Sequence, residues 1–305
     1  VLDPGCAMAY WGEAFACGPF YNMTWEKFSD DEATEATDVC YRAAQQAVGC
    51  AASATPLERA LVSALAERFQ KCHPVSLDEF SAWEVAYGKA MRGVYQHFPE
   101  HLDAIALAAE ALVTRTAWKL WDVVSGIPAK GADTLEALEM LESGLRLIEE
   151  RGEKPHLGIL HMYIHSLEMS PTPDKALPAA DALYNLSPDN GHLQHMPAHI
   201  YVLCGRYGDA IKVSDKAIDA DDKYVAHAGP YNFYSVNRCH DLLMKMHAGM
   251  LAGHLESTMQ AARGMIERLP EDLLRIDKPY VAMLLEGYYS ATEHVRVRFG
   301  HWQEI

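Results

Sequence analysis

The 305-residue sequence has few positive charges and no long apolar run. Lys and Arg number 26 against 42 Asp and Glu, and the formal net charge is −16 with histidine neutral. Binding to a phosphate backbone requires clustered Lys and Arg, so this composition argues against nucleic acid as a partner. A membrane-spanning helix needs about 18 or more consecutive apolar residues. No such stretch occurs, and we expect no membrane span.

Paired cysteines are also missing. The seven cysteines are odd in number, and none forms a C-x-x-C pair. This argues against a disulfide framework and against a cysteine zinc finger. Free thiols are typical of a reducing compartment, so we expect a cytoplasmic protein. Since the chain begins at Val1, a signal peptide that had been removed would leave no trace in it.

Several catalytic signatures are absent as well. The sequence contains no convincing G-x-G-x-x-G, phosphate-binding loop or G-x-S-x-G motif, and no H-E-x-x-H. A nucleotide cofactor, serine hydrolysis and the usual zinc-protease arrangement are therefore unsupported.

Apolar residues recur at helical spacing, and strand-like alternation is missing. Stripes such as Leu57 to Phe69 and Leu135 to Ile148 predict amphipathic helices, and the fold class is all-α. Thr134, followed by Glu136, is a plausible N-cap for the second of these helices.

One segment has the spacing of a helical repeat. Gly205, Tyr207, Ala210 and Ala217 resemble the second half of a tetratricopeptide repeat, in which small residues allow two helices to cross closely. We therefore predict a right-handed solenoid of helical hairpins, irregular in the middle, as a single domain over residues 1–305. The best repeat-like units are 1–20, 191–221, 229–268 and the start of another at 285–305, with Leu2 helping to close a preceding unit.

Histidines cluster in the middle of the chain. His161, His165 and Glu168 stand at i, i+4 and i+7, so one face of a helix presents two imidazoles and a carboxylate. Tyr163 lies between them. This spacing favours a metal site, with Glu168 as a ligand or general base and Tyr163 as a catalytic candidate, although packing is the alternative role for the tyrosine.

A second histidine cluster follows one helical hairpin later. His192, His195 and His199 stand at i, i+3 and i+7, with Tyr201 as a further catalytic candidate. Pro197 leaves two alternatives open, because a helix can run through all three histidines or begin near Met196. In a solenoid the two clusters would face each other, and His240 from the next repeat would join them.

The motifs H-x-Y-I-H-x-x-E and G-H-L-x-H-M-P-x-H-I-Y resemble those of a family of tetratricopeptide-repeat proteins known mainly from bacterial genomes. The similarity extends from about Leu2 to Ile305. It implies a helical-repeat fold and supplies no substrate. Near Asn237 and His240 the flanking residues depart from the family pattern, which makes His240 the least secure of the ligands.

Imidazole ligands favour copper, zinc or iron over calcium and magnesium. Six histidines would oversupply a single ion. We therefore expect either two metal ions, or one metal ion with some of the histidines outside its direct ligands. The leading hypothesis is a metal-dependent enzyme, an oxidoreductase or a hydrolase, acting on a small organic molecule at the concave face. Two alternatives stay open: a scaffold for a protein or peptide partner with a structural metal or a histidine-lined pocket, and a metal store or carrier.

Overall fold

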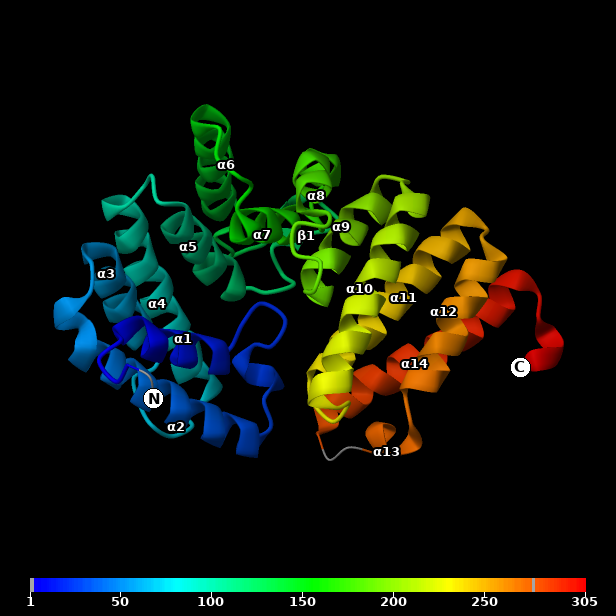
Figure 1. Cartoon of the computed structure of the whole chain (residues 1–305), viewed down its shortest axis with the longest axis horizontal. Coiled ribbons are helices and arrows are strands. Elements are labelled where there is room, and N and C mark those ends of the chain that lie inside the picture. The colour runs from blue at the N-terminus through cyan, green and yellow to red at the C-terminus, as the bar shows by residue number, and fades with distance from the viewer. Residues whose placement is uncertain (1–2, 276–277) are drawn as a thin grey trace. The chain divides into compact units, whose positions relative to one another are not determined.

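The computed structural model describes residues 3–275 and 278–305. These residues form 14 α-helices and almost no strand, which confirms the all-α class (Figure 1). The α-helices are α1 (Ala7–Cys17), α2 (Asp30–Cys50), α3 (Pro56–Ala66), α4 (Leu77–His97), α5 (Leu102–Thr114), α6 (Thr134–Arg151), α7 (Leu157–Leu167), α8 (Leu177–Leu183), α9 (Gly191–Leu203), α10 (Tyr207–Ala228), α11 (Tyr234–Ala252), α12 (Leu255–Arg268), α13 (Glu271–Leu274) and α14 (Pro279–Phe299). Short 3-10 helices cover Trp25–Lys27, Ala51–Ser53, Pro173–Ala176 and Trp302–Glu304.

The chain divides into two compact units. Unit 1 ends at Met162 and unit 2 begins at Tyr163, so the boundary falls within α7. Leu2, predicted to help close a preceding repeat, lies outside the described residues. A single repeat domain over the whole chain stays a prediction.

In unit 1, helix α5 is buried on nearly every side. Ile105, Ala108, Ala109 and Leu112 have no exposed surface, and α4 and α6 both contact this helix. An alanine-rich helix allows such close approach because its side chains are short. Helix α5 is therefore the centre of the unit 1 core.

The predicted N-cap at Thr134 is wrong. Asp133 holds the N-cap position of α6 and pairs with Arg92 and Arg115, while the Thr134 hydroxyl donates to the carbonyl oxygen of Leu120 at 2.7 Å. The hydroxyl thus ties α6 to the preceding loop. In that loop a short antiparallel hairpin pairs the two-residue strands β1 (Trp121–Asp122) and β2 (Ile127–Pro128).

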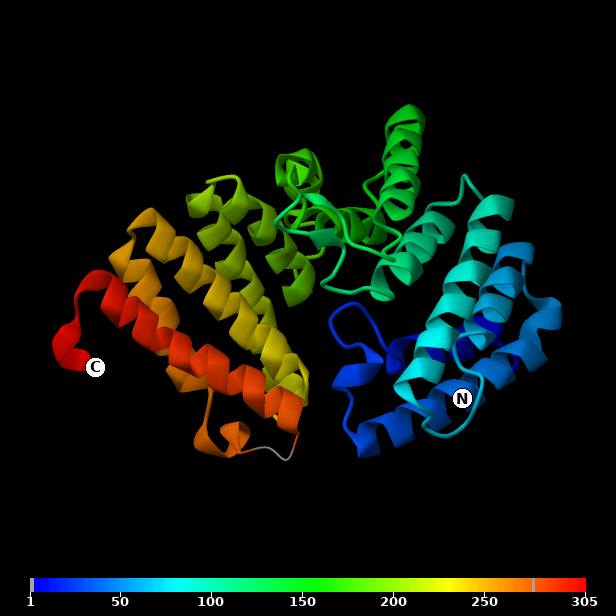
Figure 2. The ribbon, with the colours of Figure 1, turned by 180° about the vertical axis from the view of Figure 1, so that it is seen from behind.

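Unit 2 contains the helical hairpins α9–α10 and α11–α12, followed by α13 and α14. Ala210 and Ala217 are fully buried, as the repeat spacing predicts. Gly205 and Gly253 follow the first helix of each hairpin at φ of +76° and +69°, a conformation that glycine adopts without strain. Figure 2 shows α11, α12 and α14 side by side, and Met246, Met265 and Leu285 lie in the core that they enclose. The tetratricopeptide assignment itself stays a prediction.

Within the described part of the chain, no helix combines the length and the apolar character that crossing a bilayer requires.

Candidate metal centre

Helix α7 presents its histidines as the spacing predicts. His161 and His165 lie one turn apart on this helix, and Glu168 follows directly after it, with its backbone N–H donating to the carbonyl of Ile164 at 2.9 Å. The Glu168 carboxylate therefore continues the face that carries the imidazoles.

Helix α9 runs through all three histidines of the second cluster. It begins at Gly191 after Asn190, whose side chain accepts from the Leu193 N–H at 3.0 Å, and it continues past Pro197. The first of the two alternatives for Pro197 is thus confirmed, and a helix beginning near Met196 is wrong. Gly191 is required at the first turn, because a Cβ there would clash with the carboxylate of Asp221.

Two buried carboxyl groups lie close to three of the imidazoles. The Nδ1 atoms of His165 and His199 lie 2.8 Å from the two oxygens of Glu168, one on each. His195 places its Nδ1 2.9 Å from Oδ1 of Asp241 on α11. Glu168 is ionised and only accepts hydrogen bonds, so the Nδ1 atoms of His165 and His199 carry the proton and their Nε2 atoms keep a lone pair. Carboxylates orient metal-binding histidines in this way in many proteins.

Glu168 is held in the ionised form that this arrangement requires. Burial alone would raise the pKa of its carboxyl, but the neighbouring His199 and His165 outweigh that effect and hold the pKa well below its usual range. Both of its oxygens are engaged by histidines, which makes Glu168 an orienting group for the two clusters at once.

The Nε2 atoms of His195 and His199 lie only 2.7 Å apart. If each ring donates its Nδ1 proton to a carboxylate, two lone pairs face each other at this distance, and a proton or a metal cation must lie between them. Burial lowers the pKa of His195 well below the usual range, and His199 lowers it further. His199 is also subject to the effect of burial, but Glu168 raises its pKa overall. One metal ion can replace the shared proton.

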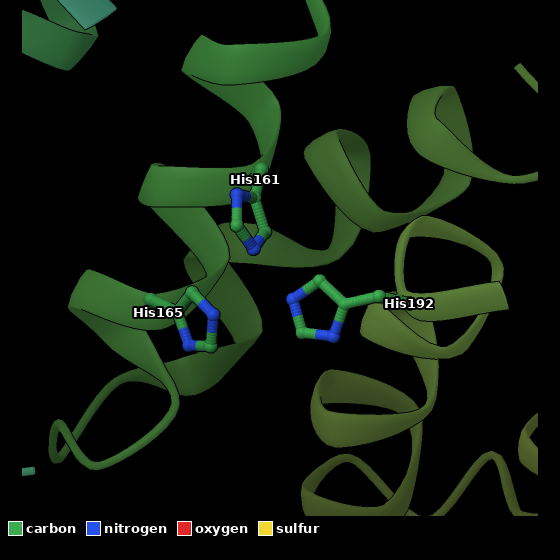
Figure 3. Close-up of side chains that lie close together, drawn as sticks. All are labelled: His161, His165 and His192. Atoms are coloured by element: carbon green, nitrogen blue, oxygen red, sulfur yellow. The ribbon is translucent and has the colours of Figure 1, made fainter. Parts of the chain in front are cut away.

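The described histidines form two groups of three potential ligands, and these groups differ from the two clusters in the sequence because His192 joins the histidines of α7. In the first group, the ring nitrogens of His161, His165 and His192 come within 4.8 Å of one another, and Figure 3 shows these rings facing a common space between two helices. The second group contains His195, His199 and His240, whose ring nitrogens also come within 4.8 Å of one another.

The two groups adjoin. Ring centroids are 6.3 Å apart between His165 and His199, and 6.4 Å apart between His192 and His195. Burial, followed by the neighbouring histidines, lowers the pKa of His192 and of His240 well below the usual range. Neutral imidazole is the form that binds a metal, so the environment prepares these side chains as ligands.

The two tyrosines predicted near the centre project elsewhere. Tyr163 stands two residues from both histidines of α7, which is about 200° around the helix. Tyr201 stands two residues after His199, and its hydroxyl donates to Asp181 at 2.7 Å. Both side chains are buried, and a catalytic role for either stays a prediction.

Asp241 and Asp221 are functional candidates that the sequence analysis did not identify. Burial is the main cause that raises the pKa of Asp241 to about 8 and, together with Asp241 itself, that of Asp221 to about 9. The Tyr234 hydroxyl donates to Asp221 at 2.7 Å. Asp241 follows His240 directly, but adjacency on a helix does not indicate which imidazole a carboxylate will contact.

The six predicted histidine ligands thus gather in one part of the fold. In comparisons with family models and with curated proteins, no family model and no curated protein matches this chain.

Proposed function

We propose that this protein binds two transition-metal ions in adjoining three-histidine sites and uses them as a metal-dependent oxidoreductase on a small organic molecule. The observation that carries the proposal is the convergence of imidazoles whose Nδ1 atoms face buried carboxylates. The 2.7 Å between the Nε2 atoms of His195 and His199 supports it most directly, because that spacing needs a cation or a proton.

The donor set favours copper, with zinc and iron as alternatives. Each group offers three neutral imidazoles and no thiolate, and imidazole suits copper, zinc, iron and nickel. At a site of given ligands Cu²⁺ binds more tightly than the other divalent ions of the first transition row. Calcium and magnesium require oxygen ligands, so neither fits.

Engagement of Glu168 favours oxidoreduction over hydrolysis. A metal hydrolase needs a base beside the attacking water, and both oxygens of Glu168 already accept hydrogen bonds from His165 and His199. Copper or iron at these histidines would supply one-electron chemistry. The protein's own part is to hold the rings of His165 and His199 in one tautomer through Glu168.

Access to the ligands is compatible with a small substrate. His161, His192, His199 and His240 are partly exposed, whereas His165 and His195 are buried. The partly exposed rings leave room for a reacting molecule at their outer edge, and the buried ones keep the inner side dry. A dry inner side strengthens the electrostatic interactions among these groups.

The experiment is reconstitution of the metal-free full chain with Cu²⁺, Zn²⁺ and Fe²⁺ separately, followed by metal analysis of the washed protein. We expect about two equivalents of copper and an electron paramagnetic resonance spectrum with nitrogen ligands. The variants His165→Ala and His199→Ala should each lose about one equivalent. His227→Ala is the matched control, since His227 is an exposed residue of α10 outside both groups.

Unchanged copper content in both cluster variants would contradict the metal site. Normal copper content with no turnover of any organic reductant under oxygen would instead support a metal store or carrier, for which six gathered imidazoles are also suited.

We also propose that this chain is a tetratricopeptide-repeat protein, and that it binds a protein or peptide partner. Support comes from the hairpins α9–α10 and α11–α12, in which Gly205 and Gly253 make the turns and Ala210 is buried. A stoichiometric partner in a pull-down, captured equally by metal-free protein, would favour the scaffold function over the enzymatic one.

A further inference from the structure

Unit 1 contains a cavity of about 230 Å³ whose lining is both aromatic and polar. It lies where the 3-10 helix at Trp25–Lys27, the first turns of α4 and the end of α5 meet. Pockets for drug-sized ligands measure about 300–1,000 Å³. This cavity is therefore suited to a smaller molecule.

The lining carries buried polar atoms that lack hydrogen-bond partners within residues 3–275 and 278–305. They are Nε1 of Trp25, Oε2 of Glu84, Nε of Arg115 and the hydroxyl oxygens of Thr24 and Thr116. Trp25 is 6% exposed and Glu84 is 8% exposed. Almost all buried polar groups in folded proteins are satisfied, so a cluster of unsatisfied ones around one cavity indicates a ligand or ordered water.

An ion pair with Arg68 holds the Glu84 side chain in place. Its Oε1 accepts from Nε of Arg68 at 3.0 Å, and Arg68 is completely buried. Because this pair holds the carboxylate in place, Oε2 is the atom left for a ligand. A buried anionic oxygen of this kind favours a cationic donor such as an ammonium group.

The donors on the same lining call for an acceptor. Nε1 of Trp25 and Nε of Arg115 can only donate, and Arg115 already pairs with Asp133 through another nitrogen of its guanidinium. A simple cation would leave both N–H groups unsatisfied. A simple anion would face the carboxylate of Glu84.

The remaining wall is apolar. The rings of Trp25 and Phe80 stack with centroids 4.2 Å apart, and Leu77 and Pro19 complete this side of the cavity. Such a surface suits an aliphatic or aromatic side chain.

We propose that this cavity binds a small zwitterion of the amino-acid type. Its ammonium group lies on Oε2 of Glu84, its carboxylate lies on Nε1 of Trp25 and Nε of Arg115, and its side chain packs against Phe80. None of these residues belongs to either histidine group, so the proposal is independent of the proposed metal sites.

Isothermal titration calorimetry on the full chain, without added metal, tests the ligand class. The probes are L-leucine, its decarboxylated amine 3-methylbutylamine and its deaminated acid 4-methylpentanoate, followed by the other standard L-amino acids. We expect at least one amino acid to bind, and we expect the amine and the acid of the leucine series to bind at least about 10-fold more weakly than leucine itself. Absence of binding by every standard amino acid, or equal binding of leucine and the amine, overturns the proposal.

Trp25→Phe tests the placement of the carboxylate. It keeps a ring stacked on Phe80 and removes the Nε1–H donor, so affinity for the best amino acid should fall about 10-fold. The matched control is Trp83→Phe, because Trp83 is buried against Phe80, edge-to-face at 5.3 Å, but does not line the cavity.

We expect the Trp83→Phe control to keep its affinity for the same amino acid. Circular dichroism checks that both variants fold. An equal loss in the two variants overturns the assignment. A Glu84 variant is unsuitable for this purpose, since it would leave Arg68 buried without its partner.

Discussion

Replacement of Glu168 by Gln is the sharpest perturbation of the proposed metal centre. The amide has one acceptor oxygen, whereas the carboxylate accepts from His165 and His199 at 2.8 Å each. Whichever way the amide turns, its NH₂ group faces one of the two Nδ1 atoms. That ring must move its proton to Nε2, and it then has no lone pair to offer the metal from that atom.

The expected magnitude follows from this loss of one ligand. Mutation of a residue that orients a metal-binding histidine costs about 10–100-fold in metal affinity, or about 1.4–2.8 kcal/mol. We expect Glu168→Gln to weaken one of the two sites by this amount and to leave the other close to normal. Asp241→Asn should have a smaller effect, because burial raises the pKa of Asp241 to about 8 and the carboxyl is already mostly neutral at pH 7.

Competition with a chelator of known affinity at fixed pH measures the two dissociation constants. The matched control is Glu286→Gln, an exposed residue of α14. Thermal unfolding of each metal-free variant shows whether the fold survives. Equal affinities in Glu168→Gln and Glu286→Gln would refute the reasoning, since they would mean that the carboxylate does not set the tautomers of the ligands.

Two further predictions concern the fold. Gly205→Ala should lower the free energy of unfolding by about 1–2 kcal/mol, because φ is +76° at this position. Gly208→Ala, in the first turn of α10, should raise the free energy of unfolding by up to about 1 kcal/mol. Urea denaturation compares the two variants, and an equal loss in both would contradict the role of Gly205 in the turn. Burial, followed by Cys17, raises the pKa of the Cys40 thiol to about 12, so the reactive thiolate should be scarce at Cys40 at pH 8. Iodoacetamide should therefore label the exposed Cys72 first, which peptide mass spectrometry can follow. Rapid labelling of Cys40 in the native state would show that this thiol is not buried.

The spacing of residues along a helix accounts for the part of the proposed metal centre that the sequence predicts. The positions of His161 and His165 on one helix, and of His192, His195 and His199 on another, follow from 3.6 residues per turn. The histidine-rich character of the site was therefore visible before any tertiary contact was known.

Local cues were less reliable where a side chain had a stronger partner elsewhere. Thr134 has the chemistry of an N-cap, yet its hydroxyl binds the carbonyl of Leu120, and Asp133 takes the cap position. Pro197 suggested a helix start, but α9 continues through it. In both cases packing outweighed a preference of the order of 1–3 kcal/mol.

The sequence by itself determined the helical class and the faces on which the imidazoles stand, because both depend on residues close together in the chain. Only the tertiary structure decided that Glu168 contacts two rings, that Asp241 lies against a third, and that unpartnered polar atoms of Trp25 and Glu84 line one cavity. Each of these relations joins side chains from different helices or loops, or depends on which oxygen of a carboxylate is occupied. Periodicity along the chain carries no information about such contacts, since they arise from packing between segments.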